Sequence, residues 1–585
     1  MLVGVEYPEL AERTGRFRFG APHALTVGDD GARVAFLRSA GPQRPAPALW
    51  VLNVATAALT EITPGPVDSY AGSASLDVLA WAHEGRLASS AAGPVATAVP
   101  VRDPRPDPTG RHIGYVTADG CLRVVADGDD QLLAGEPGSG VSWGVPEPAA
   151  AEFGRRRGWW WAPDGTQILA VRGAGASASL HLLDLYGGWV DVHWDRETYP
   201  YLVDVHWRGP GNALLTVLRR TQQHGLVLSV DPRTGETQVH AELADARWVE
   251  PVPGTPRQLP DGRVLVGGEL AHDGFDARCL FADGSLITPP GLYVRRVAGV
   301  LPRPAGGPEL IIEGTDGEPG EQHVYAVRTA LGGGGAKARR LTAAPGWHTA
   351  TVGGDVLVIN LTVARGGADV LTLPSLAAPL PYRPEPVLER VTDRRLPSAV
   401  LYPTGHFTGT RLPVLLELGA GPGHQQVVAD PARWQERQWW ADAGFVVVSV
   451  DTRGTPGVAP SFEKVVYRRV ADVALTDQID ALHTLTGKHP DLDLTRVAVR
   501  GTGLGGWLAA LALSRRPEVF RCGVARDPVT DWTALPPAFA ERYLGSHTDN
   551  ADIYQHHSVS PPATLLLSPD GDLSAELAFV TRECA

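Results

Sequence analysis

Short strands with alternating apolar and polar positions recur between about residues 20 and 380, each preceded by a turn containing Gly with Asp or Pro. The clear copies occupy residues 29–36, 108–116, 162–169 and 259–266, and weaker copies occupy 81–87, 207–215, 302–312 and 352–359. Paired strands that repeat at such intervals are typical of β-propeller blades. We therefore predict an all-β propeller of seven or eight blades over residues 21–384, with a β-sandwich with many turns as the alternative.

The pattern changes after about residue 385, where strands alternate with longer helical stretches. Residues 414–418 and 445–450 are continuous apolar runs, as expected for parallel strands that are buried on both faces. Helical periodicity lies between and after them, in residues 434–443, 472–485 and 508–516. This alternation predicts a doubly wound α/β domain over residues 385–585, with residues 1–20 as a separate N-terminal segment.

Composition narrows the possible partners and the compartment. The formal net charge of −13 over 585 residues argues against binding to nucleic acid or to anionic membranes, because both need a basic patch. The N-terminus has no basic and apolar leader, and no run of about 18 apolar residues occurs, so neither export nor a membrane anchor is expected. The four cysteines lie far apart without a C-x-x-C spacing. We therefore expect reduced thiols in a cytoplasmic protein, without a bound metal or cofactor.

Residues 496–507 combine a buried strand, a Gly-rich turn and the start of a helix, as the nucleophile elbow of serine hydrolases does. In G-x-S-x-G the glycines permit a sharp turn that presents the serine as nucleophile. Here Gly503 stands where that serine is expected. Glycine has no side chain that could attack a carbonyl or be activated by a base, so we predict that the turn is kept and the nucleophile is lost.

Six further motifs occur in the same order as in a known protein family. They occupy residues 155–165 (Arg-Arg-Arg-Gly-Trp-Trp-Trp-Ala-Pro-Asp-Gly), 198–202, 345–348, 451–457, 527–532 and 541–545. On these motifs the chain resembles, over nearly its whole length, the dipeptidyl-peptidase IV branch of the prolyl oligopeptidase family. The resemblance implies a propeller followed by an α/β-hydrolase domain. It also implies substrates with a free N-terminal amine and a proline or alanine in the second position.

The resemblance also implies that the catalytic site is largely dismantled. Gly501 to Gly506 matches the family's G-W-S-Y-G-G except at the nucleophile and its two aromatic neighbours, and Gly419 replaces the tyrosine that donates to the oxyanion. Asp572 is a possible relic of the catalytic carboxylate. The catalytic histidine is expected some tens of residues later, but the sequence ends at Ala585. We therefore expect a hydrolase domain that lacks its histidine and its last strand. Loss of a triad's nucleophile or base lowers the rate about a million-fold.

Part of the substrate-binding surface is expected to persist. The resemblance implies that Glu152, the one acid kept from a pair of adjacent glutamates, holds an amine, although a solvated helix residue is the alternative. Four further positions match the apolar pocket of the family: Val529, Trp532, Leu535 and Phe539. For the two aromatic residues among them, the alternative is that they are simply buried in the core. Thr502, His424 and His483 could supply a hydroxyl or a base, but nothing in the sequence pairs them. Residues 101–108, rich in proline and arginine, suggest an extended surface connector.

Two functions follow from these observations. The first is a catalytically inactive dipeptidyl-peptidase IV-like protein that binds a peptide or a protein partner such as an active paralogue. The alternative is a residual or repurposed serine-peptidase-like hydrolase that acts on peptides. By analogy with the family, a homo- or hetero-dimer is expected.

Overall fold

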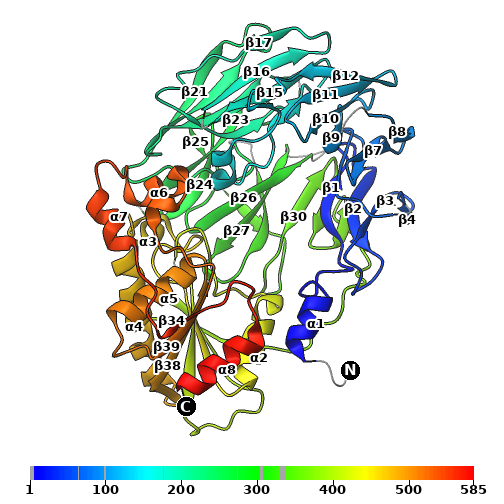
Figure 1. The fold of residues 1–585 in the computed structure, drawn as a ribbon. Helices are drawn as coiled ribbons and strands as arrows, with labels where there is room; N and C mark the ends of the chain where they lie inside the picture. The colour runs from blue at the N-terminus through cyan, green and yellow to red at the C-terminus, as the bar shows by residue number, and fades with distance from the viewer. Residues whose placement is uncertain are drawn as a thin grey trace.

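The computed structural model describes residues 6–584 apart from 64, 98–99, 176, 210, 273, 303–306, 329–336 and 420. It shows an eight-bladed β-propeller above an α/β-hydrolase domain (Figure 1). No helix in these residues is long and apolar enough to cross a membrane. The structure confirms the propeller, decides for eight blades rather than seven, and shows that the β-sandwich alternative is wrong.

Each blade is an antiparallel sheet of four strands, with a fifth strand, β14, added in the fourth blade. The first four blades comprise β1 (His23–Val27), β2 (Arg33–Ser39), β3 (Pro47–Asn53), β4 (Ala58–Glu61); β5 (Ser69–Gly72), β6 (Leu79–His83), β7 (Arg86–Ser89), β8 (Gly93–Val95); β9 (Val101–Pro106), β10 (Ile113–Thr117), β11 (Leu122–Ala126), β12 (Asp129–Ala134); and β13 (Val141–Trp143), β14 (Trp159–Trp161), β15 (Gln167–Ala174), β16 (Ser177–Asp184), β17 (Trp189–Asp191). The last four comprise β18 (Tyr201–His206), β19 (Ala213–Leu218), β20 (His224–Val230), β21 (Thr237–Ala244); β22 (Arg257–Gln258), β23 (Val264–Leu270), β24 (Ala277–Ala282), β25 (Ser285–Leu286); β26 (Leu292–Leu301), β27 (Glu309–Asp316), β28 (His323–Arg328), β29 (Ala338–Arg340); and β30 (Ala350–Gly353), β31 (Val356–Ile359), β32 (Thr362–Arg365), β33 (Ala368–Thr372).

The repeated turn motif marks the blades one by one, because every blade contains one copy. Seven copies run into the second strand of the blade's main ladder, as residues 29–36 do between β1 and β2. The copy at 81–87 spans the following turn, between β6 and β7. The prediction that residues 101–108 form a surface connector is wrong, because 101–106 are β9, the first strand of the third blade. Proline is tolerated there because β9 lies at the edge of its sheet, with β10 as partner.

The hydrolase domain is built on a sheet with the strand order β34-β35-β37-β36-β38-β39-β40 in the described residues. Its strands are β34 (Val387–Val391), β35 (Leu396–Leu401), β36 (Leu412–Leu418), β37 (Val446–Val450), β38 (Leu492–Thr502), β39 (Cys522–Arg526) and β40 (Leu565–Leu567). β34 pairs antiparallel with β35 and β35 with β37, and the remaining pairs are parallel. The central strands are buried along their length, as their continuous apolar runs predict.

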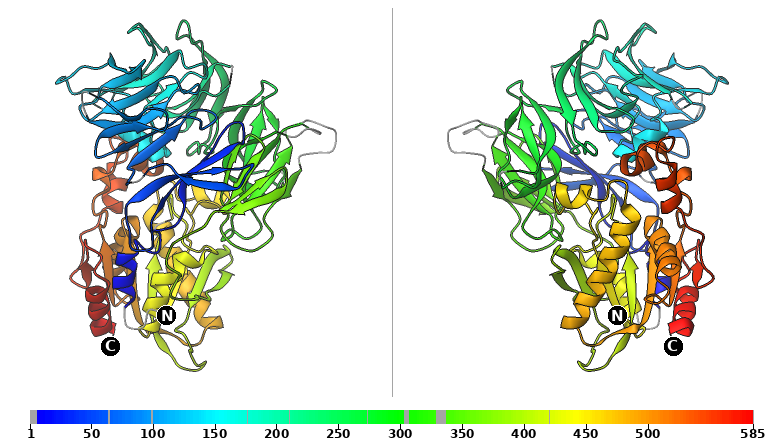
Figure 2. Two further views of the ribbon diagram at one scale, coloured as in Figure 1. Left: turned by 90° about the vertical axis from the view of Figure 1, so that its right-hand side faces the viewer. Right: turned by 90° about the vertical axis from the view of Figure 1, so that its left-hand side faces the viewer.

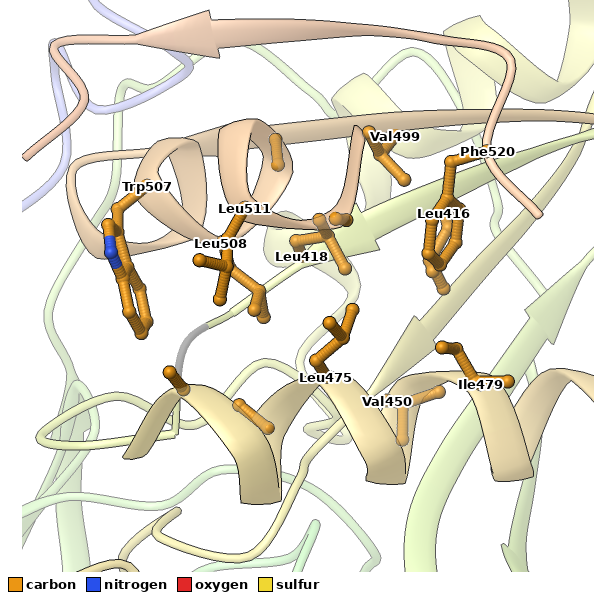
Figure 3. Packing of buried hydrophobic residues seen from close by; sticks show 14 of the residues in the cluster. Leu416, Leu418, Val450, Leu475, Ile479, Val499, Trp507, Leu508, Leu511 and Phe520 are labelled. Atoms are coloured by element: carbon orange, nitrogen blue, oxygen red, sulfur yellow. The ribbon is translucent and has the colours of Figure 1, made fainter. Parts of the chain in front are cut away.

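Helices cover both faces of this sheet (Figures 1 and 2). They are α1 (Tyr7–Arg13), α2 (Gln435–Asp442), α3 (Pro460–Lys464), α4 (Val470–Lys488), α5 (Leu504–Arg515), α6 (Pro537–Leu544), α7 (Ala551–His557) and α8 (Leu573–Cys584), with 3-10 turns η1 (Pro148–Phe153), η2 (Pro431–Trp434) and η3 (Trp532–Ala534). α4 and α5 share one apolar core with the sheet, and Figure 3 shows Trp507, Leu508 and Leu511 of α5 within it. α1, α2 and α8 share the core on the other face. The N-terminal segment therefore packs in the hydrolase domain, although the whole propeller separates the two in sequence.

Charged side chains join the two domains at the base of the propeller. Arg220 donates two hydrogen bonds of 2.7 Å to Glu541 of α6, and the Lys464 ammonium donates to Asp245 at 2.8 Å. Trp248 of the propeller is fully buried in the hydrolase core, with its ring centroid 5.2 Å from that of Tyr543. These contacts fix α6, and the C-terminal end of α3, against the fifth blade.

Candidate functional site

The elbow between β38 and α5 has the geometry of a strained hydrolase turn. Gly503 takes φ 58° and ψ −116°, and its N–H donates to the carbonyl of Arg526 at 2.8 Å. A Cβ at Gly501 would overlap the backbone of Gly505, and a Cβ at Gly505 would overlap the carbonyl oxygen of Leu418. The flanking glycines are therefore needed because strand and helix lie in direct backbone contact at this turn.

The position of the missing side chain is open. A Cβ built on Gly503 meets no atom within 4 Å among its neighbours. The turn would thus present a serine to free space, as the elbow motif does, but glycine presents only backbone. No hydrogen bond joins Thr502 to His424 or His483 in the described part of the chain, and the imidazole of His424 contacts Arg433 at 3.3 Å instead. Within the described residues, neither imidazole is therefore paired with the Thr502 hydroxyl.

The buried side-chain amide of Gln426 lies over Gly419, the position at which the resemblance to the family predicts the loss of a donor to the oxyanion. The Gln426 side chain fills the space that a Cβ on Gly419 would need, with its Nε2 nearest. Arg437 donates to Gln426 Oε1 at 3.0 Å, which fixes the orientation of the amide because a flipped amide would set NH2 against a guanidinium. Nε2 is buried and has no hydrogen-bond partner in the described residues. Sequence reasoning missed Gln426, because no motif connects it to Gly419.

Gln426 Nε2 and the N-terminus of α5 lie close to the same strand end. Gly419 follows directly after β36, and a Cβ on Gly505 would stand 3.9 Å from the Gly419 Cα. Asp451 holds the loop in place, because its two carboxylate oxygens accept from the backbone N–H groups of Gln426 at 2.8 Å and Val427 at 3.1 Å. Burial raises the pKa of Asp451 to about 6. An amide donor and the positive end of a helix together suit a carbonyl or carboxylate oxygen.

Asp572 has a structural task in this fold. Its Oδ1 accepts from the backbone N–H groups of Ser574 at 2.9 Å and Ala575 at 3.1 Å. These bonds cap the N-terminus of α8, and the residue is exposed. Nothing in the described residues links its carboxylate to an imidazole, so a catalytic role for Asp572 finds no support in its contacts.

The four apolar pocket candidates gather beside the elbow. Val529 lies nearest, because its N–H points to the Gly503 carbonyl at 3.4 Å. Trp532 is fully buried, with ring centroids 5.2 Å from Trp507 and 6.2 Å from Phe539. Trp532 therefore belongs to the core, as the structural alternative states. Val529, Leu535 and Phe539 are only partly buried and pack against that core, so these three leave apolar surface available.

The structure also brings Glu152 to this region from the propeller. Glu152 lies in η1, which packs against α6, and the Arg542 guanidinium lies 5.4 Å from the neighbouring Phe153 ring. The Glu152 carboxylate is half-buried and makes no ion pair within the described ranges. Burial raises its pKa, and Arg542 partly opposes this. A desolvated carboxylate without a partner suits an ammonium group. No group of three or more potential metal ligands occurs in the residues that the structure describes.

Comparison with known proteins places these features in context. Residues 432–570 match the model of the prolyl oligopeptidase family. Human dipeptidyl peptidase 8 is 30% identical over 197 residues, which are 33% of this chain and 22% of that protein. Dipeptidyl peptidase family member 2 of Caenorhabditis elegans is 29% identical over 176 residues, which are 29% of this chain and 21% of that protein. The matches thus span about a fifth of the length of these curated relatives.

The fold likeness covers the chain as a whole. The crystal structure of Porphyromonas gingivalis dipeptidyl peptidase 4 superposes with a TM-score of 0.79 at 19% identity, covering 99% of this chain and 94% of that one. At this identity the likeness establishes the fold, a propeller followed by an α/β-hydrolase domain.

Proposed function

We propose that this chain, a dipeptidyl-peptidase-IV-like member of the prolyl oligopeptidase family, binds peptides at the junction of its two domains without cleaving them. The observation that supports this most directly is the elbow, which keeps its turn geometry while Gly503 presents only backbone to open space. Nucleophilic catalysis needs an activated side chain at that point. Binding needs only the surrounding surface, much of which persists.

The groups around the elbow match the parts of a peptide N-terminus. Glu152 would pair with the free amine, and Val529, Leu535 and Phe539 would contact an apolar second side chain. The Nε2 of Gln426, which has no hydrogen-bond partner among the described residues, would donate to a carbonyl oxygen beside the N-terminus of α5. Among the described residues, Glu152 has no ion-pair partner and Gln426 Nε2 has no hydrogen-bond partner. The three apolar side chains are only partly buried.

Calorimetric titration of the purified protein with Ala-Pro and with N-acetyl-Ala-Pro tests this arrangement. We expect the free dipeptide to bind, and the acetylated one to bind much more weakly because it has no ammonium group. Glu152→Gln should raise the Kd for Ala-Pro about tenfold, since a hydrogen bond to a charged group contributes about 1.5–3 kcal/mol. Gln426→Leu should raise it a few-fold, by about 1 kcal/mol. Glu385→Gln, at an exposed glutamate, serves as the control.

Hydrolysis of a Gly-Pro chromogenic substrate separates this function from the alternative. We expect no turnover above buffer for the wild-type protein. Turnover that survives purification to homogeneity and falls in Glu152→Gln would instead support the residual or repurposed hydrolase. Equal binding of free and acetylated dipeptide would overturn the assigned role of Glu152.

The cysteines support the proposal of a cytoplasmic setting. All four are free and buried, and the Sγ atoms of Cys522 and Cys584 lie 3.4 Å apart without a bond. A reducing compartment keeps such a pair as thiols. Alkylation of the unfolded protein purified under anaerobic conditions should therefore label four thiols.

A further inference from the structure

A cavity lies within the propeller, away from the elbow. It has a volume of about 420 Å³ and is lined by residues in or next to the first strands of the first three blades, by β14 and by β18. Three arginines, Arg105, Arg157 and Arg208, line it together with His206 and several tryptophans. The chain as a whole carries a net charge of −13, so a cavity with three guanidinium groups is a local exception.

Arg157 has no partner for its charge. Its guanidinium makes no hydrogen bond or ion pair with any described residue, and its Nε is buried. Desolvation and the nearby charges of Arg105 and Arg208 lower the pKa of Arg157 to about 9. The group is therefore a cation at neutral pH in a place that disfavours cations. A buried charge without a counterion is expensive, so such a group normally pairs with an anion.

Two of the three carboxylates near Arg157 are already engaged in ion pairs. Asp103 accepts from Arg105 at 2.7 and 3.1 Å, and Asp29 lies 3.5 Å from Arg208. The third, Asp204, accepts the N–H of Val205 at 2.8 Å and makes no ion pair with a described residue; burial raises its pKa although Arg155, Arg157 and Arg257 oppose the shift, which makes it a weaker counterion. Among the described residues, the Arg157 guanidinium thus lines the cavity without a hydrogen-bond acceptor or an ion-pair partner.

We propose that this cavity binds a small oxyanion, a carboxylate or a phosphate group, held mainly by Arg157 with Arg105 and Arg208 beside it. A planar guanidinium offers parallel N–H donors that match two oxygens of such a group. Burial and the neighbouring arginines Arg257 and Arg208 lower the pKa of His206 to about 3, so its neutral ring can donate one further hydrogen bond. The site is built from propeller residues alone, and it does not depend on the peptide-binding function proposed for the elbow.

Titration of the full-length protein with inorganic phosphate, at constant ionic strength in chloride buffer, tests the proposal. We expect saturable binding at one site. Arg157→Gln should raise the Kd about tenfold or more, because hydrogen bonds to a charged group contribute about 1.5–3 kcal/mol. Arg156→Gln is the matched control, since Arg156 is the adjacent, exposed arginine and does not line the cavity. Arg208→Gln should raise the Kd only a few-fold, because that side chain is 68% exposed.

A second pair of ligands distinguishes the source of the anion. An N-acetylated tripeptide with a free C-terminal carboxylate is compared with its C-terminal amide, so that the amine-binding site is not engaged. Binding of the acid but not the amide identifies a peptide carboxylate, and binding of phosphate alone identifies a phosphate group. If neither binds, or if Arg156→Gln and Arg157→Gln weaken binding equally, the proposal is wrong. If circular dichroism shows that Arg157→Gln does not fold, the other two variants test the proposal. Arg208→Gln should then weaken phosphate binding more than Arg156→Gln does, and equal effects would overturn the proposal.

Discussion

Three glycines of the hydrolase domain, two at the elbow and one in α4, should respond very differently to alanine, although all lie in or next to a helix. At Gly503 a Cβ meets nothing within 4 Å, so only the positive φ of 58° opposes it. With ψ at −116° this backbone conformation lies outside the left-handed α region and is strained for an L-residue by about 1–3 kcal/mol, and the less flexible unfolded chain returns about 0.4–1 kcal/mol. We therefore expect Gly503→Ala and Gly503→Ser to lower the free energy of unfolding by about 1–2 kcal/mol.

At Gly505 the φ is unremarkable, but a Cβ would lie closer than 3.0 Å to the backbone oxygen of Leu418. Neither atom belongs to a flexible side chain, so α5 must move away from β36. Overpacking of this kind costs about 1–3 kcal/mol and occasionally more, and a rigid backbone on both sides places Gly505→Ala at about 3 kcal/mol. Gly487→Ala in α4 is the control, because its Cβ meets no atom within 4 Å and alanine there should stabilise the helix by about 0.5–1 kcal/mol.

Urea unfolding followed by far-UV circular dichroism gives the free energies of unfolding for the variants beside the wild type. The expected order of stability is Gly487→Ala, wild type, Gly503→Ala and then Gly505→Ala. If Gly503→Ala were as destabilising as Gly505→Ala, the space in front of the elbow would not be open. The inference that the nucleophile's position is vacant would then fail.

Three further predictions concern buried carboxylates. Glu576 is fully buried and accepts from Arg500 at 3.0 Å and from Arg526 at 2.6 Å, so Glu576→Gln should lower the free energy of unfolding by about 3 kcal/mol. Glu583→Gln on the same helix should cost at most about 1 kcal/mol, because Glu583 is only partly buried and its one ion pair, with Arg582, lies at the surface; equal losses in a denaturant titration would contradict this. Burial raises the pKa of Glu463 from 4.5 to about 7, so the folded state holds a proton that the unfolded state has released between these values. The stability of the wild type relative to Glu463→Gln should therefore fall as the pH rises from 5 to 7.5, and a flat difference in thermal midpoint would refute the shift. Asp451→Asn should cost about 1–3 kcal/mol and weaken dipeptide binding, because the two loop N–H groups at 426–427 bond to different carboxylate oxygens and the asparagine NH2 would face one of them as a second donor. Wild-type affinity and stability would argue against the anchoring role.

The repeated turns and the change in hydrophobic period were sufficient to predict the architecture. A Gly-Asp turn and an alternating strand are encoded within about ten residues, and each blade repeats them, so the pattern survives without knowledge of distant contacts. The same holds for the elbow, because Gly501, Gly503 and Gly505 specify a sharp turn through their own backbone freedom. The absence of a nucleophile at Gly503 is likewise a property of the sequence alone.

Proline content was a poorer guide in the third blade. Residues 101–106 contain two prolines and were predicted to be a connector, yet they form β9. A strand needs its ladder hydrogen bonds on one side only when it lies at the edge of a sheet. Which strand lies at an edge is decided by the closure of the propeller and leaves no local signal.

The sequence by itself therefore determined the two domains, their order and the vacant nucleophile position. Only the tertiary structure decided that Gln426 covers Gly419, that Asp572 caps α8 and that Arg157 faces a cavity without a counterion. It alone showed that α1 packs against the hydrolase core, although the whole propeller separates the two in the sequence. The physical reason is that periodicity and turn chemistry act between neighbours in the chain. Burial and charge pairing depend instead on which distant residues the packed domains bring together.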